Sequence, residues 1–298
     1  MGNNKGWLEV ITTRLIIISG YSAIIFVFLI FYFLLEAGLP TIRNVQLTNL
    51  LGQRWYPIEE YFGLLPLIIG SITVTIGAAL FAVPVGIAIA IFIAEIAPSW
   101  ARNILKPIIE VLGGIPSVIL GFLGILVFAP YIRRLLDLPT GLSVFTGALL
   151  LGAISIPTIA SISEDALDAV PRSYRDASLA LGTTEWQTIW YVTLPAARSG
   201  VLTAIMLGIG RAFGETMAVM MVTGNAPVIP SGLALFFSPI RTMTATIAAE
   251  MGEVATGSTH YQVLFMIGIL LFLIELVVNI TASTVVIKQR KRSERILS

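Results

Sequence analysis

The sequence predicts an all-α, polytopic membrane protein that crosses the bilayer six times. Three observations predict this fold class: six apolar runs of about 20 residues or more, a hydrophobic content of 56%, and a charged content of only 12% over 298 residues. Soluble domains typically hold about 45–50% apolar and about 25% charged residues. The mean hydropathy of +0.92 points the same way. The composition therefore excludes an ordinary soluble domain, and the absence of cysteine excludes disulfides and thiolate metal sites.

The predicted membrane helices correspond to apolar runs at about residues 13–35, 64–94, 108–129, 142–162, 200–223 and 262–287. The first run is long enough to span and is followed by no A-x-A cleavage site, so we expect a retained helix. The second run is longer than one crossing needs, which predicts a tilted helix or one that begins outside the bilayer. Runs two, three and five are rich in glycine, which lets helices approach closely in lipid. Together the runs predict a single permease-like domain over residues 1–298.

Two prolines fall within these runs. Pro116 lies in the third predicted helix and Pro157 in the fourth, where each would free the carbonyl four residues earlier. Free carbonyls repel anions, so we expect both prolines to act as hinges or kinks and not as ligands.

Basic residues are distributed unequally between the two predicted sides. Of the 18 Lys and Arg residues, twelve lie on one side and five on the other, and the last is Arg211 inside the fifth run. Cytoplasmic loops carry the excess of Lys and Arg, so both termini and the loop at about 164–197 are predicted to be cytoplasmic. The loops at about 36–63 and 225–261 are then outside. The basic run at 288–295 is expected to anchor the last helix beside membrane lipid.

The polar loop between the fourth and fifth runs carries the signals of two short helices. Pro171 suits a first helical turn, and Gly182 suits a left-handed helix end. Thr184 and Gln187 have the spacing of a capping box that begins a second helix, which is expected to stop near Pro195. Long loops between membrane helices are usually functional, so this segment is predicted to be a docking site.

Two opposite charges lie inside the fifth run. Arg211 and Glu215 are about a dozen residues from either end, which places them near the membrane midplane. Each charge costs about 2.5–3.5 kcal/mol or more at that depth on insertion scales. Their spacing would put them on one face of a continuous helix, where they could neutralise each other. We expect them to line a solute path; an inert internal ion pair is the alternative.

The polar loop resembles the EAA loop of bacterial ABC-importer permeases. The resemblance rests on Asp176-Ala177-Ser178, then Gly182 and Leu194-Pro195, with Asp in place of the usual Glu and Ser in place of the second Ala. It implies the MetI-like permease fold and a coupling helix that seats in a cleft of an ATPase subunit. An ordinary amphipathic loop is the alternative. The residues implied in coupling are Ser173, Tyr174, Arg175, Asp176, Ala177, Ser178 and Gly182.

Other runs resemble the phosphate ABC transporter permeases of the PstC type, a branch of the binding-protein-dependent transport inner-membrane components. These runs are residues 208–219, which contain Arg211 and Glu215, residues 115–118 with Gly121, and residues 243–250. In that family an arginine and a nearby glutamate of the fifth helix are implicated in translocation. The resemblance therefore implies phosphate as the solute and assigns the path to Arg211 and Glu215.

The same resemblance implies the partners and the source of energy. A second, related permease, two ATP-binding subunits and an extracytoplasmic phosphate-binding protein are expected in a bacterial inner membrane, and no nucleic acid. The sequence contains no G-x-x-x-x-G-K-[ST] motif, so no ATPase site is expected in this chain. ATP and magnesium would be used by the partner, and no cofactor or metal is expected here. His260 is the single histidine, too few for a histidine-based metal site.

Two other functions remain open at this point. The solute could be another oxyanion, such as sulfate or molybdate. A secondary, ion-coupled transporter would instead use Glu215 as its ion site, but such proteins typically show repeated halves with paired broken helices, and the coupling loop would have no use in one.

Overall fold

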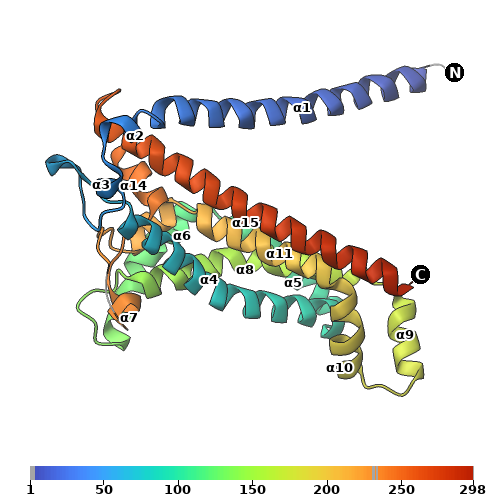
Figure 1. Ribbon diagram of the computed structural model, residues 1–298. Helices are drawn as coiled ribbons and strands as arrows, with labels where there is room; N and C mark the ends of the chain where they lie inside the picture. The colour runs from blue at the N-terminus through green and yellow to red at the C-terminus, as the bar shows by residue number, and fades with distance from the viewer. Residues whose placement is uncertain (1–3, 230–231, 233, 298) are drawn as a thin grey trace.

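The computed structural model describes residues 4–229, 232 and 234–297, and its main feature is a bundle of long helices (Figure 1). Six helical segments in the described part are long and apolar enough to cross a membrane, which confirms the predicted fold class. Five of them contain an α-helix of at least 21 residues. They are built from α1 (Asn4–Gly38), α4 (Leu65–Ile91) with the π-helical η2 (Phe92–Ile96), α8 (Val144–Asp168), α10 (Glu185–Thr188) with the π-helical η4 (Ile189–Thr193) and α11 (Leu194–Gly214), and α15 (Thr259–Leu297).

The remaining crossing is assembled from α6 (Ser117–Leu123), the π-helical η3 (Gly124–Phe128) and α7 (Ala129–Leu135). Short elements lie at both ends of the bundle (Figure 1). One end, here the hairpin end, carries the antiparallel pair β1 (Trp55–Tyr56) and β2 (Tyr61–Phe62). It also holds α2 (Thr41–Asn44), α3 (Leu47–Leu50), η1 (Pro57–Glu59), α13 (Ala234–Phe237) and α14 (Met243–Glu250). The other, here the α9 end, carries α9 (Arg172–Ala180).

Helix α8 forms the centre of the bundle, between α4 and α11. Small residues let the three helices approach: a Cβ atom on Gly86 of α4 would lie 2.8 Å from Ile159 Cγ2, and one on Gly208 of α11 would overlap the same isoleucine. Ile159 is fully buried between them. The predicted use of glycine for close helix packing therefore holds on both sides of α8.

Helix α1 packs on the bundle only near its C-terminal end. Phe31 stacks on Phe272 of α15 with ring centroids 4.7 Å apart, and Gly38 lies against Ile269. Towards its N-terminus α1 diverges from α15 (Figure 1), and nothing lies within 4 Å of a Cβ placed on Gly20. Most of the apolar surface of this helix is therefore not covered by the other described residues of the chain.

The predicted third span, 108–129, is wrong at its start. Residues Ser99–Gly113 form a separate helix, α5, and the crossing runs over Ser117–Leu135. Pro116 is not inside a span but directly before α6, and the Leu112 carbonyl, expected to be free, accepts a bond from Ile115 N at 3.3 Å. The residues on either side of Gly113-Gly114 are apolar, so hydropathy alone reads them as one run and does not show the break. The hinge role of Pro116 stays a prediction.

The expected end of a helix near Pro195 is also wrong. Pro195 is the second residue of α11 and follows directly after the π-helical η4. The π-helical η4 leads directly into α11, so residues Glu185–Gly214 form one continuous helical segment. The loop end of this segment projects beyond the bundle beside α9 (Figure 1).

The basic run at 288–295, predicted to meet lipid, lies in the last part of α15. Its side chains lie outside the described residues.

Candidate functional site

Arg211 occupies the last turn of α11 and reaches two neighbouring elements. Its guanidinium donates to Thr158 Oγ1 of α8 at 2.8 Å and to the Gly113 carbonyl at the end of α5 at 3.0 Å. The side chain is half-buried. A permanent cation is thus held by one hydroxyl and one backbone carbonyl, with no carboxylate partner among the ion pairs of the described residues.

The predicted helix face shared by Arg211 and Glu215 does not exist. Helix α11 ends at Gly214, Glu215 is extended (φ −68°, ψ 130°), and a new helix, α12 (Met217–Val222), begins two residues later. The Glu215 carboxylate accepts from Thr216 N at 3.1 Å, and its carbonyl accepts from Thr244 Oγ1 at 3.1 Å. Thr244 belongs to α14, so the break ties the fifth crossing to the hairpin end.

Irregular backbone gathers around Arg211. The break after Gly113, the break at Glu215 and Pro157 within α8 lie close together, since Arg211 bonds the carbonyl of Gly113 and a Cβ on Gly113 would lie 3.5 Å from Pro157 Cβ. Non-helical backbone at membrane depth is tolerated only where it is buried in protein or lines a water-filled cavity. Pro157, a predicted hinge, lies beside this region, because the next residue, Thr158, accepts from the guanidinium.

The sequence analysis missed one intramembrane carboxylate, Glu275 of α15. Its Oε1 would lie 3.5 Å from a Cβ on Gly210, the residue before Arg211. Glu275 is half-buried within the last crossing, Thr259–Thr281. The sequence does carry a signal for Glu275, which lies within the apolar run at 262–287. A charge at membrane depth is costly, so its presence there marks a candidate functional residue.

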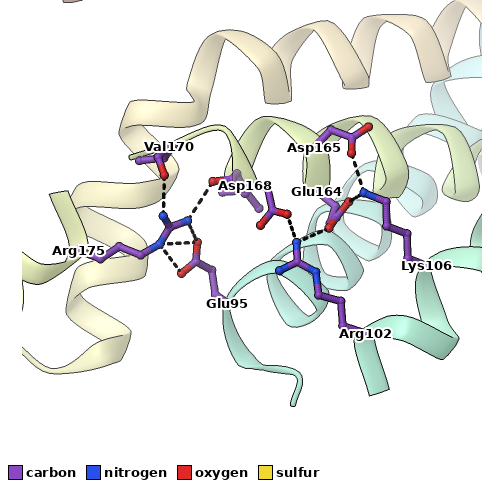
Figure 2. A network of polar contacts seen from close by, with 9 residues as sticks. Glu95, Arg102, Lys106, Glu164, Asp165, Asp168, Val170 and Arg175 are labelled. Atoms are coloured by element: carbon purple, nitrogen blue, oxygen red, sulfur yellow. Dashed lines mark hydrogen bonds and ion pairs between the residues drawn. The ribbon is translucent and has the colours of Figure 1, made fainter. Parts of the chain in front are cut away.

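A network of ion pairs closes the α9 end of the bundle (Figure 2). Glu164 of α8 is only 1% exposed and accepts from Arg102 at 2.7 Å and from Lys106 at 2.6 Å, both on α5. Lys106 also pairs with Asp165 at 2.7 Å, and Arg102 with Asp168. The hydrogen bond that Lys106 donates to Asp165 is the largest cause that raises the pKa of this lysine above its ordinary value, and the bond to Glu164 is the next. The network pins α5 against the end of α8.

Arg175, a predicted coupling residue, points inward from α9. Its Nε and Nη2 donate to Glu95 of η2 at 3.1–3.2 Å and 2.5 Å, and its remaining donors reach the carbonyls of Val170 at 2.7 Å and Leu167 at 2.9 Å (Figure 2). The Arg175 and Glu95 side chains are 19% and 8% exposed. This arginine therefore fastens α9 to the bundle, and its predicted role in coupling stays a prediction.

The other predicted coupling residues divide into two groups. Ser178 is buried, and its hydroxyl shares a hydrogen bond with Thr183 at 2.7 Å. Gly182 has φ +87°, the left-handed conformation predicted for the end of the first helix. The capping box also forms: Thr184 N donates to Gln187 Oε1 at 2.9 Å and Gln187 N to Thr184 Oγ1 at 3.2 Å. Of the predicted coupling residues on α9, four are exposed: Ser173, Tyr174, Asp176 and Ala177.

At the hairpin end, Glu250 collects three donors. Arg241 Nη1 lies 2.5 Å and Trp55 Nε1 3.1 Å from Oε1, and His260 Nε2 lies 2.8 Å from Oε2. These four residues line a cavity of about 420 Å³. His260 therefore forms a hydrogen bond with the carboxylate of Glu250, which Arg241 and Trp55 also contact. No group of three or more potential metal-ligating side chains occurs within the described residues.

Comparison with known proteins agrees with this architecture. Residues 82–292 match the family described as "Binding-protein-dependent transport system inner membrane component". The chain is 45% identical over 219 residues to the "Probable ABC transporter permease protein YqgH" of Bacillus subtilis, covering 73% of this chain and 70% of that protein. It is 34% identical to the "Phosphate transport system permease protein PstC" of Pasteurella multocida, covering 90% and 91% of the two chains.

Solved structures share the fold at low identity. A structure of the MetNI methionine ABC transporter in an inward-facing conformation superposes with a TM-score of 0.60 at 19% identity, covering 79% of this chain and 99% of that one. A bacterial ABC transporter involved in alginate import gives a TM-score of 0.62 at 16% identity, covering 95% and 99%. The predicted resemblance to PstC-type permeases and to the ABC-importer fold is thereby confirmed. The chain belongs to the family of binding-protein-dependent transport system inner membrane components.

Proposed function

We propose that this chain is the membrane permease subunit of an ATP-driven phosphate importer. The observation that carries the proposal is Arg211, a permanent cation among broken helices inside the bundle, in a chain similar over most of its length to phosphate transport permeases. A second, related permease would complete the path. Two ATP-binding subunits would drive it, and an extracytoplasmic phosphate-binding protein would deliver the solute.

The chemistry of Arg211 suits a phosphate oxyanion. A guanidinium stays charged at any relevant pH and presents fixed donors to the oxygens of phosphate. In this conformation two of those donors are occupied by Thr158 and by the Gly113 carbonyl. Phosphate oxygens would replace these acceptors when α5 and α8 separate around Arg211. Binding would then be tied to one conformation of the bundle, as alternating access requires.

Glu215 is proposed to act on the same path without an ion pair to Arg211. A carboxylate near the path lowers the net attraction for an anion, so that phosphate passes without being trapped. It could also accept a hydrogen bond from the protonated oxygen of HPO4²⁻, which sulfate lacks. Replacing Glu215 with Gln should therefore change phosphate flux or the preference for phosphate over sulfate. Unchanged flux together with unchanged preference would exclude both roles.

The α9 end is proposed to face the cytoplasm and the ATPase subunits. Most Lys and Arg residues lie on that side, and α9 leaves Ser173, Tyr174, Asp176 and Ala177 exposed there. ATP and magnesium would be bound by the partner, so the chain would carry no cofactor and catalyse no reaction of its own.

The experiment is uptake of labelled phosphate into vesicles that hold the reconstituted complex, with and without internal ATP. We expect uptake to require ATP and the phosphate-binding protein, and excess unlabelled sulfate or molybdate to leave it unchanged. Competition by those oxyanions at equal concentration would reassign the solute. Uptake driven by a proton gradient alone would overturn the proposal in favour of an ion-coupled transporter.

A further inference from the structure

Glu95 stands at the end of the second crossing and has no assigned role. It lies in η2, the π-helical continuation of α4, and its side chain is almost fully buried. We infer that Glu95 is a positioning residue that holds the coupling helix α9 to α4 through Arg175. The inference rests on the proposed function, because it concerns how movement of α9 would reach the membrane helices.

The contact between the two residues is two-pronged. Arg175 Nε lies 3.2 Å from Oε1 and 3.1 Å from Oε2 of Glu95, and Nη2 lies 2.5 Å from Oε1. A fork of this kind fixes direction as well as distance, because the planar guanidinium must lie in register with the carboxylate. A lysine could not reproduce it, since an ammonium group is a single point of charge.

Arg175 also holds the end of α8. Its two outer nitrogens donate to the carbonyls of Leu167 and Val170, beyond which the chain turns into α9. The Leu167 carbonyl also accepts from Val170 N at 3.2 Å, so the arginine adds a second donor at the end of α8. One side chain therefore joins α9, α8 and the end of α4.

The backbone at Glu95 is not ordinary α-helix. Residues Phe92–Ile96 are π-helical, and Ala97 N donates to the Phe92 carbonyl at 2.7 Å, five residues earlier. Such turns insert one extra residue and are frequent at functional sites. Here the turn occurs in the segment that carries Glu95, immediately before the chain leaves the bundle for α5.

These contacts make α4 the membrane helix to which α9 is bound by an ion pair. The ion pairs of Arg102 and Lys106 join α5 to α8 and leave α9 out. A push on α9 is therefore expected to reach α4 by way of Arg175 and Glu95. If this contact is loosened, α9 can still dock on an ATPase, but its displacement moves the membrane helices less.

The test compares phosphate uptake per ATP hydrolysed for the reconstituted complex carrying Glu95→Gln, Arg175→Lys or both. We expect each single variant to lower this ratio about tenfold while the complex still hydrolyses ATP. The double variant should fall no further than the worse single variant, because both changes remove one contact. Matched controls are Glu9→Gln and Arg14→Gln on exposed positions of α1, which should keep the ratio of the unmodified complex.

If Glu95→Gln fails to assemble, Glu95→Asp keeps the charge on a shorter arm and is measured in its place. A purely structural role predicts normal uptake per ATP in whatever complex assembles, and that result would overturn the inference. Additive losses in the double variant would overturn it as well. Absence of ATP-dependent phosphate uptake in the unmodified complex would instead count against the proposed function.

Discussion

The guanidinium of Arg211 donates a hydrogen bond to the hydroxyl of Thr158, 2.8 Å away, although the two residues belong to different crossings of the bundle. The same guanidinium reaches the Gly113 carbonyl at 3.0 Å. Three chain segments thus meet at one charge. Among the ion pairs of the described residues, none joins this guanidinium to a carboxylate. Its two acceptors are neutral, so an anion could replace them.

Replacing Thr158 with Val should destabilise the protein. The change removes an acceptor from a half-buried guanidinium and adds an apolar methyl, at a cost of about 1–3 kcal/mol. The measurement is thermal unfolding of the purified protein in detergent. Thr158→Ser should behave nearly as the parent protein. Thr203→Val is the matched control, because the Thr203 hydroxyl only bonds the Ser199 carbonyl of its own helix. Equal midpoints for Thr158→Val and the parent would contradict the prediction.

Replacing Arg211 with Lys should lower ATP-dependent phosphate uptake at least tenfold. The ammonium keeps the charge, but it cannot present the two fixed donors that reach Thr158 and Gly113. Such a loss corresponds to about 1.4 kcal/mol or more, the scale of one charge-assisted hydrogen bond. Uptake rates across a range of phosphate concentrations test it. Full activity of the lysine variant would show that charge alone suffices.

Replacing Glu164 with Leu should destabilise the α9 end. Arg102 and Lys106 would lose a buried acceptor, and breaking a buried ion pair from one side costs about 3 kcal/mol or more. The two cations are about a third exposed, with values of 30% and 33%, so we expect the lower end of that range. Glu110→Leu, on the exposed face of α5, is the control and should change stability by about 0.5 kcal/mol or less. Unfolding midpoints in detergent decide between them.

Lys106 should make stability depend on pH in strongly alkaline solution. The pKa of Lys106 is raised above 10.5 in the folded protein. A group with a raised pKa stabilises the fold below its unfolded pKa and loses that effect as pH rises through the folded value. Midpoints should therefore stay level between about pH 7 and 9 as far as Lys106 is concerned. Above about pH 10 they should fall more steeply for the parent than for Lys106→Met. Parallel curves for the two proteins would contradict this.

Replacing Gly208 with Ala should destabilise the bundle by about 1–3 kcal/mol, because the new methyl overlaps Ile159 in a packed core. Gly20→Ala offers the comparison, since nothing lies within 4 Å of its Cβ position and alanine is the better helix former. The parent and both variants are compared by thermal unfolding. A larger loss at Gly20 than at Gly208 would be inconsistent with the packing around α8.

Local signals in the sequence were sufficient for the number of crossings and for the glycine turn and capping box of the polar loop. Hydropathy predicts six crossings, and the left-handed Gly182 and the box formed by Thr184 and Gln187 are where their spacing puts them. These features depend on one or two neighbouring turns. They are therefore readable from residue type alone.

The wrong predictions concern where helices begin, break and end, both between the crossings and within them. Gly113-Gly114 and Gly214 interrupt helices in stretches that are apolar enough to read as continuous. The sequence predicts a helix end at Pro195, because a π-helical entry into α11 has no hydropathy signal. The coupling role of Arg175 stays a prediction, but its contact with Glu95, eighty residues earlier, comes from the fold alone. Contacts at such separations are set by packing.

Helix α5 joins two otherwise distant regions and carries a proline between them. Lys106 fixes one part to α8, Gly113 at the far end meets Arg211, and Pro107 stands directly after the fixed part. At 1.5 Å per residue, the stretch from 106 to 113 is an arm of about 10 Å. Proline is a common pivot in helices. A rotation of roughly 20° about Pro107 would move Gly113 by about 3.5 Å. This is enough to break the hydrogen bond between its carbonyl and Arg211, and the freed donor could then bind an anion on the path.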